Sequence, residues 1–154
     1  MKKLSLLLFM VIVAISGCEK EPVDIPIEEL QIGDTYEDGI VCYIDEYDGI
    51  VESIEIMSLS DLGELLSTEV PGAVDAFKDG KDPNWHVPVY RELKHIIGAF
   101  DVISPITETK YYWFDNIGEL LFVDANHGNN TNYPTSPDNG LPHWLRMHRR
   151  IVIN

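Results

Sequence analysis

The most basic stretch of the chain lies near its C-terminus and could bind an anion. Residues 143–150 read His-Trp-Leu-Arg-Met-His-Arg-Arg. An arginine guanidinium can donate two parallel hydrogen bonds to a carboxylate or to a sugar acid, so Arg146 and Arg149 are candidate ligand contacts. The alternative is that these arginines pair with the carboxylates of the chain itself, because 26 Asp and Glu residues face 11 Lys and Arg residues.

Aromatic side chains near this stretch could form stacking surfaces for sugar rings. Trp113 and Trp144, together with Tyr111, Tyr112 and Tyr133, have the right chemistry, although aromatic side chains more often pack inside a core. Asp115 follows the Tyr-Tyr-Trp-Phe run and could accept hydrogen bonds from a sugar. The candidate ligand-binding residues are therefore Trp113, Asp115, Trp144, Arg146 and Arg149.

A polar segment between residues 124 and 140 is rich in side-chain oxygens, the ligands that calcium prefers. Calcium takes six to eight oxygen ligands, and the candidates here are Asp124, Asn126, Asn129 and Asp138. Asp124 and Asn126 have the spacing that begins an EF-hand loop, but the twelfth position is Thr135 rather than glutamate. Asn, Asp, Gly and Pro are also common in ordinary turns. The expectation is that no cofactor is bound, with calcium as the alternative.

Two pairs of an imidazole and a carboxylate could support acid–base chemistry. They are Asp124 with His127, and His86 with Glu92. The sequence contains no nucleophile elbow, no HExxH motif and no CxxC motif beside them. The sequence therefore predicts a protein that is not an enzyme, with a hydrolase as the weaker alternative.

The elements that would position these residues are short strands and short helices in a single domain. Apolar runs predict a hairpin of residues 40–44 and 50–56 around Asp48-Gly49, and a second hairpin of residues 111–114 and 119–124. Helical spacing predicts helices over residues 58–66, 71–78 and 88–99, and a closing strand over 144–153. This mixture predicts an α+β fold with small antiparallel sheets and long loops.

Four of these segments, in order, resemble a bacterial family with a C-type-lectin-like fold, typified by the C-terminal domain of collagen-like adhesins. Residues 85–93, Trp-His-Val-Pro-Val-Tyr-Arg-Glu-Leu, resemble its Trp-x-Leu-Pro-Thr-x-x-Glu-Leu signature, with Val89 in place of the threonine. Residues 112–115 resemble its Tyr-Trp-Ser-Ser strand, and residues 145–149 its Val-Arg-x-Val-Arg strand. Residues 39–45 are similar to its opening hairpin. The resemblance implies a C-type-lectin-like domain that binds a surface ligand.

The N-terminus has the pattern of a lipoprotein signal. Lys2 and Lys3 precede an apolar run over residues 4–15, and Ser16-Gly17 precede Cys18. Such a run is too short to span a bilayer, so we expect residues 1–17 to be a cleaved signal peptide and Cys18 to be acylated. Residues 18–31 are predicted to be an acidic tether, and residues 32–154 the domain. The expected location is the outer membrane or cell surface, with contact to the membrane through the lipid alone.

Charge and cysteine content exclude several partners and one mode of stabilisation. The formal net charge of −15 disfavours nucleic acid, anionic membrane and sulfated glycans. With Cys18 acylated, Cys42 is left alone, so no internal disulfide is expected; Cys42 is predicted to be a buried apolar residue.

The sequence thus predicts a lipid-anchored surface lipoprotein that binds a glycan or a protein ligand without catalysis. The alternative is a structural or accessory lipoprotein of the envelope with no ligand of its own.

Overall fold

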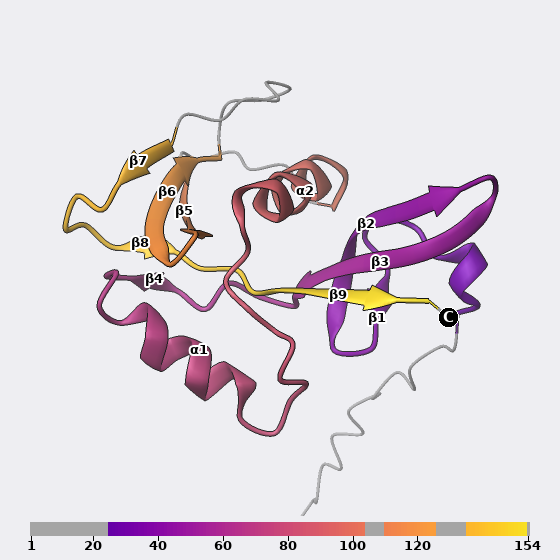
Figure 1. Cartoon of the computed structure of the whole chain (residues 1–154), viewed down its shortest axis with the longest axis horizontal. Coiled ribbons are helices and arrows are strands. Elements are labelled where there is room, and N and C mark those ends of the chain that lie inside the picture. The colour runs from indigo at the N-terminus through magenta and orange to yellow at the C-terminus, as the bar shows by residue number, and fades with distance from the viewer. Residues whose placement is uncertain (1–24, 104–109, 126–134, 154) are drawn as a thin grey trace, which may run out of the picture.

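The computed structural model describes residues 25–103, 110–125 and 135–153. Within these residues the chain forms two sheets and two α-helices, an α+β arrangement (Figure 1). The elements in chain order are the 3-10 helix η1 (Ile27–Glu29), β1 (Thr35–Tyr36), β2 (Gly39–Tyr47), β3 (Ile50–Ser58), β4 (Glu64–Leu65), α1 (Val70–Lys78), α2 (Tyr90–Ile103), β5 (Tyr111–Asn116), β6 (Glu119–Asp124), β7 (Thr135–Pro137), β8 (His143–Trp144) and β9 (His148–Val152).

The first sheet has the order β1-β2-β3-β9 and is antiparallel throughout. Its central hairpin turns at Asp48 and Gly49, which both have positive φ angles of 53° and 77°. Positive φ at both central residues is the conformation that an Asp-Gly hairpin turn favours. The predicted first hairpin is therefore confirmed, with strands that are longer than expected.

The second sheet has the order β4-β8-β5-β6-β7. The hairpin of β5 and β6 is antiparallel and turns at Ile117 and Gly118, and β8 lies parallel to β5, with Trp144 opposite Tyr112. The predicted second hairpin is confirmed. Because β8 comes from the C-terminal segment, that segment contributes to both sheets.

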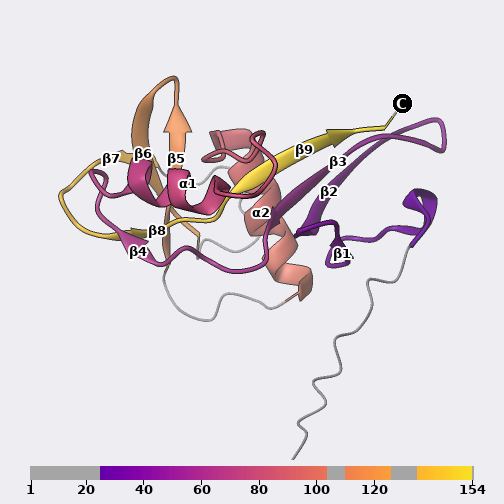
Figure 2. The same ribbon diagram turned by 90° about the horizontal axis from the view of Figure 1, so that it is seen from below.

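Helix α2 lies between the two sheets (Figures 1 and 2). Its buried side chains are Leu93, Ile96, Ile97, Ala99 and Phe100, which share a hydrophobic cluster with residues of both sheets. A second cluster lies around two fully buried tryptophans, Trp85 and Trp113. Burying such large aromatic rings is a major part of core stability, so Trp85 and Trp113 anchor the packing of this cluster.

The segment between the two helices links the two sheets. His86 and His148 exchange backbone hydrogen bonds of 2.9 and 3.0 Å, which ties the segment to the start of β9. Two residues later, the carbonyl of Pro88 accepts a 2.9 Å hydrogen bond from the N–H of Asp115 on β5. Helix α2 then starts at Tyr90, two residues after the proline at which the helix was expected to begin.

Two predicted elements are wrong. Residues 58–66 do not form a helix; they end β3 and lead into β4, with the N–H of Leu62 donating to the carbonyl of Leu145 at 2.8 Å and Gly63 at a φ of +106°. Residues 144–153 do not form one strand, because the chain leaves the second sheet after Trp144 and joins the first at His148. In both places pairing between distant segments overrides the local pattern.

The folded region begins ahead of the predicted boundary at residue 32. Leu30 is buried, and Ile25 and Ile27 pack against the second cluster, so part of the predicted tether belongs to the core. Residues 1–24, which include the predicted signal peptide and Cys18, lie outside the described residues. Among the described residues, neither helix is long and apolar enough to cross a bilayer.

Candidate functional site

A buried carboxylate on β3 organises a cluster of histidines. The side chain of Glu55 is 2 % exposed, and its Oε2 accepts hydrogen bonds from His95 Nδ1 at 2.6 Å and from His148 Nε2 at 3.1 Å. Arg91 Nη2 lies 3.8 Å from the other oxygen. The ring of His95 stacks on Tyr43 with centroids 3.9 Å apart. Burial without partners would be costly for a carboxylate, and these contacts supply the partners.

A second carboxylate lies on the other side of His148. Glu92 Oε2 is 3.4 Å from His148 Nδ1 and 3.0 Å from His86 Nε2, while the two imidazole nitrogens are 3.3 Å apart. Glu92 also accepts the backbone N–H of Val89 at 2.9 Å, in the manner of the N3 glutamate of a capping box. The start of α2 thereby fixes this carboxylate. His86, Glu92 and His148 are called the histidine–glutamate cluster below.

Hydrogen bonds in and beside the cluster keep the carboxylates of Glu92 and Glu55 ionised. Burial raises the pKa of Glu55, but hydrogen bonds from His148 and His95 outweigh it and lower the pKa to about 2. Burial also raises the pKa of Glu92, but the hydrogen bond from His86 outweighs this effect and lowers the pKa below its ordinary value. The same hydrogen bond from His86 to Glu92 raises the pKa of His86. Both carboxylates are therefore anionic at neutral pH. Imidazole nitrogens and carboxylate oxygens are also the atoms with which proteins bind metals such as zinc.

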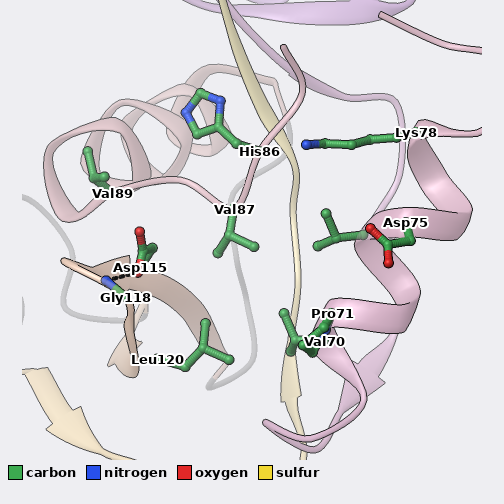
Figure 3. A pocket seen from close by; sticks show the side chains of 11 residues that line it. Val70, Pro71, Asp75, Lys78, His86, Val87, Val89, Asp115, Gly118 and Leu120 are labelled. Atoms are coloured by element: carbon green, nitrogen blue, oxygen red, sulfur yellow. Dashed lines mark hydrogen bonds between the residues drawn. The ribbon is translucent and has the colours of Figure 1, made fainter. Parts of the chain in front are cut away.

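A pocket of about 480 Å³ adjoins this cluster at His86 (Figure 3). It lies between α1, the segment over residues 86–89 and the β5–β6 hairpin. Six aliphatic residues line it: Val70, Pro71, Val74, Val87, Val89 and Leu120. The polar lining residues are Asp75, Lys78, His86 and Asp115. A volume of this size with apolar walls and a few polar groups is typical of ligand sites.

The five predicted ligand-binding residues do not form one site. Trp113 is fully buried and donates its indole N–H to the carbonyl of Leu65 at 2.7 Å. Arg146 pairs with Asp61 at 2.8 Å and donates to the carbonyl of Ser58 at 2.6 Å.

The other three are dispersed as well. Arg149 is 3 % exposed and pairs with Glu37 and Asp82. Lys110 Nζ lies 4.4 Å from the ring centroid of Trp144. Of the five, only Asp115 lines the pocket, and its Oδ1 accepts the N–H of Gly118 at 2.8 Å. Arg146 and Arg149 thus pair with the chain's own carboxylates, which was the alternative to ligand binding.

The predicted calcium ligands are separated in what the structure describes. Asn126 and Asn129 lie outside the described residues, as does His127. Asp124 ends β6, whereas Asp138 accepts hydrogen bonds from the hydroxyl of Ser67 and, at 2.8 Å, from the N–H of Gly140. The bond from Gly140 is an ordinary turn contact of an aspartate. Calcium binding stays a prediction.

The sequence indicated the pairing of His86 with Glu92 but not the third member of the cluster, His148, nor its neighbours Glu55 and His95. The available signal was Glu55 itself, a charged residue between Ile54 and Ile56 in an apolar strand. A charge at such a position is rarely buried unless it is paired. Its histidine partners come from residues 40 and 93 positions further along the chain, so only the fold brings them together.

The fold and the cluster define a class: an α+β domain with a histidine–glutamate cluster beside an apolar pocket. A comparison of the chain with models of known protein families gives no match, and neither does a comparison with curated proteins.

Proposed function

We propose that this chain is a non-catalytic binding protein that holds a protein ligand in the pocket beside α1. The pocket of about 480 Å³ is the observation that carries the proposal. A pocket this large with aliphatic walls exposes apolar surface that a bound side chain would cover. The β5–β6 hairpin and α1 hold its walls, so the binding surface is preformed.

The chemistry of the lining favours a protein over a glycan as the ligand. The lining residues include no Trp, Tyr or Phe ring on which a sugar could stack, whereas valine, proline and leucine walls suit an apolar side chain. Asp75 and Asp115 outnumber Lys78 among the charged lining residues, and the chain carries a net charge of −15. Charge complementarity therefore favours a ligand with Lys or Arg beside its apolar residue.

We further propose that the domain has a C-type-lectin-like fold. Support comes from the fully buried Trp85, from Glu92 at the first turn of α2 and from the order of the two later strand segments. An experimental structure tests this. If β2, β3, α2, β5, β6 and β9 cannot be superposed in this order on C-type-lectin-like domains, the assignment fails.

Anchoring through Cys18 at the outer membrane or cell surface is the third part of the proposal. Its support is the basic, apolar and small-residue pattern of residues 2–18. Labelling of cells with a fatty-acid analogue should mark the parent chain and leave a Cys18→Ser chain unmarked. Protease added to intact cells should remove the domain. A labelled Cys18→Ser chain would contradict the anchor, and a domain protected in intact cells would contradict surface exposure.

The binding proposal is tested with a displayed library of random peptides and the full chain in detergent micelles. We expect enrichment of peptides with an apolar residue beside Lys or Arg. Val89→Lys should abolish binding, because Val89 lines the pocket and its side chain is replaced by a charge that repels a basic peptide. Val102→Lys is the matched control, since Val102 is also an exposed valine but is not among the lining residues.

The outcomes separate the alternatives. Peptides lost with Val89→Lys and kept with Val102→Lys support the proposal. No enrichment over the heat-denatured chain, or equal loss with both variants, contradicts it. A glycan array is run in parallel. If a glycan binds the parent chain and Val102→Lys but not Val89→Lys, the ligand of the pocket is a glycan rather than a protein.

A further inference from the structure

Three potential ligand atoms converge in the histidine–glutamate cluster. They are His86 Nε2, His148 Nδ1 and Glu92 Oε2, and their separations are 3.0, 3.3 and 3.4 Å. Zinc binds such nitrogen and oxygen atoms at about 2.0–2.1 Å in a tetrahedral arrangement, which places neighbouring ligand atoms roughly 3.3–3.4 Å apart. The spacing of the cluster is therefore close to that of three corners of a zinc tetrahedron.

The second nitrogen of each histidine fixes which nitrogen carries the proton. His86 Nδ1 lies 2.8 Å from the carbonyl oxygen of Asn84, and this oxygen can only accept a hydrogen bond. His148 Nε2 lies 3.1 Å from the anionic Glu55 carboxylate, which also only accepts. In the neutral rings, the lone pairs of His86 Nε2 and His148 Nδ1 therefore face each other and the Glu92 carboxylate. Three electron-rich atoms at this distance require a proton or a cation between them.

We propose that His86, Glu92 and His148 bind a zinc ion. Metal-bound histidines characteristically donate their other N–H to a carboxylate or to a backbone carbonyl, and both kinds of partner are present here. Glu55 is the carboxylate behind His148, and His95 and Arg91 hold Glu55 in turn. Three protein ligands leave a fourth position open for water or for a donor atom of a bound molecule.

The nature and spacing of the ligands favour zinc. Two imidazoles and one carboxylate suit zinc and iron(II), whereas calcium and magnesium prefer sites made of oxygen atoms alone, and the near-tetrahedral separations favour zinc over the octahedral iron(II) site. The backbone holds all three residues: His86 and His148 form a reciprocal hydrogen-bonded pair, and Glu92 is fixed by its bond to the N–H of Val89.

The ion can reach the cluster from solvent. The side chain of His86 is 41 % exposed, whereas that of His148 is fully buried. Because His86 also lines the pocket, the ion would lie next to any molecule held there. The zinc site does not depend on the identity of that molecule, and zinc binding can be measured without it.

The test is a titration of the full chain, in detergent and freed of metal by a chelator, with Zn²⁺ alone. We expect one tightly bound ion per chain. His86→Ala should weaken zinc binding about 100-fold or more, since removal of outer partners alone typically costs 10–100-fold. Glu92→Gln should also weaken it strongly, while the glutamine oxygen still accepts the N–H of Val89 and preserves the helix start.

His143→Gln is the matched control, because His143 is a buried histidine of the second sheet outside the cluster. It should leave zinc affinity unchanged. A second measurement uses only the parent chain: Co²⁺ in place of zinc should give the intense visible absorption of a tetrahedral site, so the test does not depend on variants that fold poorly. Loss of zinc in His86→Ala and Glu92→Gln but not in His143→Gln supports the site. Zinc binding that all three variants retain, or a Co²⁺ spectrum of octahedral type, would overturn it.

Discussion

His86 and His148 are 62 residues apart and meet as a reciprocal backbone pair, with ring centroids 5.1 Å apart at an interplanar angle of 73°. This contact joins the segment before α2 to the start of β9. It also brings the two imidazoles to the same carboxylate, Glu92. One structural link therefore both closes the fold and assembles the histidine–glutamate cluster.

Glu55→Gln should destabilise the folded chain substantially. The substitution keeps the shape of the side chain but removes the charge that holds His95 and His148. Hydrogen bonds to a charged group contribute roughly 1.5–3 kcal/mol each, so we expect the free energy of unfolding to fall by about 3 kcal/mol. Denaturant titration with a chelator present measures this.

The control is Glu52→Gln, an exposed glutamate on the same strand. Its effect should stay within about 0.5 kcal/mol. Equal losses for the two variants would show that the buried network around Glu55 contributes nothing to stability.

Arg149→Met and Arg150→Met should differ although the residues are adjacent. Arg149 is buried against Glu37, Asp38 and Asp82, whose own side chains are partly exposed, so its removal leaves carboxylates that water can partly solvate, at a cost of about 1–3 kcal/mol. The side chain of Arg150 is 42 % exposed in its pair with Asp45, and such surface pairs contribute less than about 1 kcal/mol. Thermal or denaturant unfolding compares them. Similar small losses for both would mean that Arg149 is not a structural residue and would reopen it as a ligand contact.

His143 should make the folded chain less stable in mild acid. Burial lowers the pKa of His143 below its ordinary value of 6.5, against the opposing effect of the Asp138 and Glu64 carboxylates. The unfolded chain then binds a proton at pH values where the folded chain does not. The stability that this residue contributes is therefore complete above pH 6.5 and is lost as the pH falls below it.

His143→Gln isolates this contribution, because the other titrating groups are common to both chains. The difference in the free energy of unfolding between parent and variant should be smaller at about pH 5 than at about pH 7.5. A difference that grows in acid would contradict the lowered pKa.

The elements that could be predicted from the sequence are those that local chemistry determines. Asp48-Gly49 fixes the first hairpin turn, and the helices predicted over residues 71–78 and 88–99 match α1 and most of α2. The predictions of secondary structure fail where hydrogen bonds between distant segments determine the backbone conformation. Leu62 and Leu65 have helical spacing, but hydrogen bonds to the chain around residues 143–145 hold their backbone in an extended conformation.

The candidate site was less predictable than the fold, because its members are far apart in the chain. The Glu92 side of the cluster is local, since His86 and Glu92 are six residues apart across a helix start. Glu55 and His148 are paired only through the register of β3 with β9, in which Met57 lies opposite His148. Composition and spacing carry no information on that register, whereas the apolar neighbours of Glu55 do indicate that it must be paired.

Anomalous diffraction at the zinc edge, from crystals of the full chain grown with Zn²⁺, shows whether the histidine–glutamate cluster binds zinc. We expect a single strong peak about 2.0–2.1 Å from His86 Nε2 and His148 Nδ1, with a Glu92 oxygen as the third protein ligand. An ordered cluster without a peak, in which His86 remains hydrogen-bonded to Glu92, would contradict zinc binding.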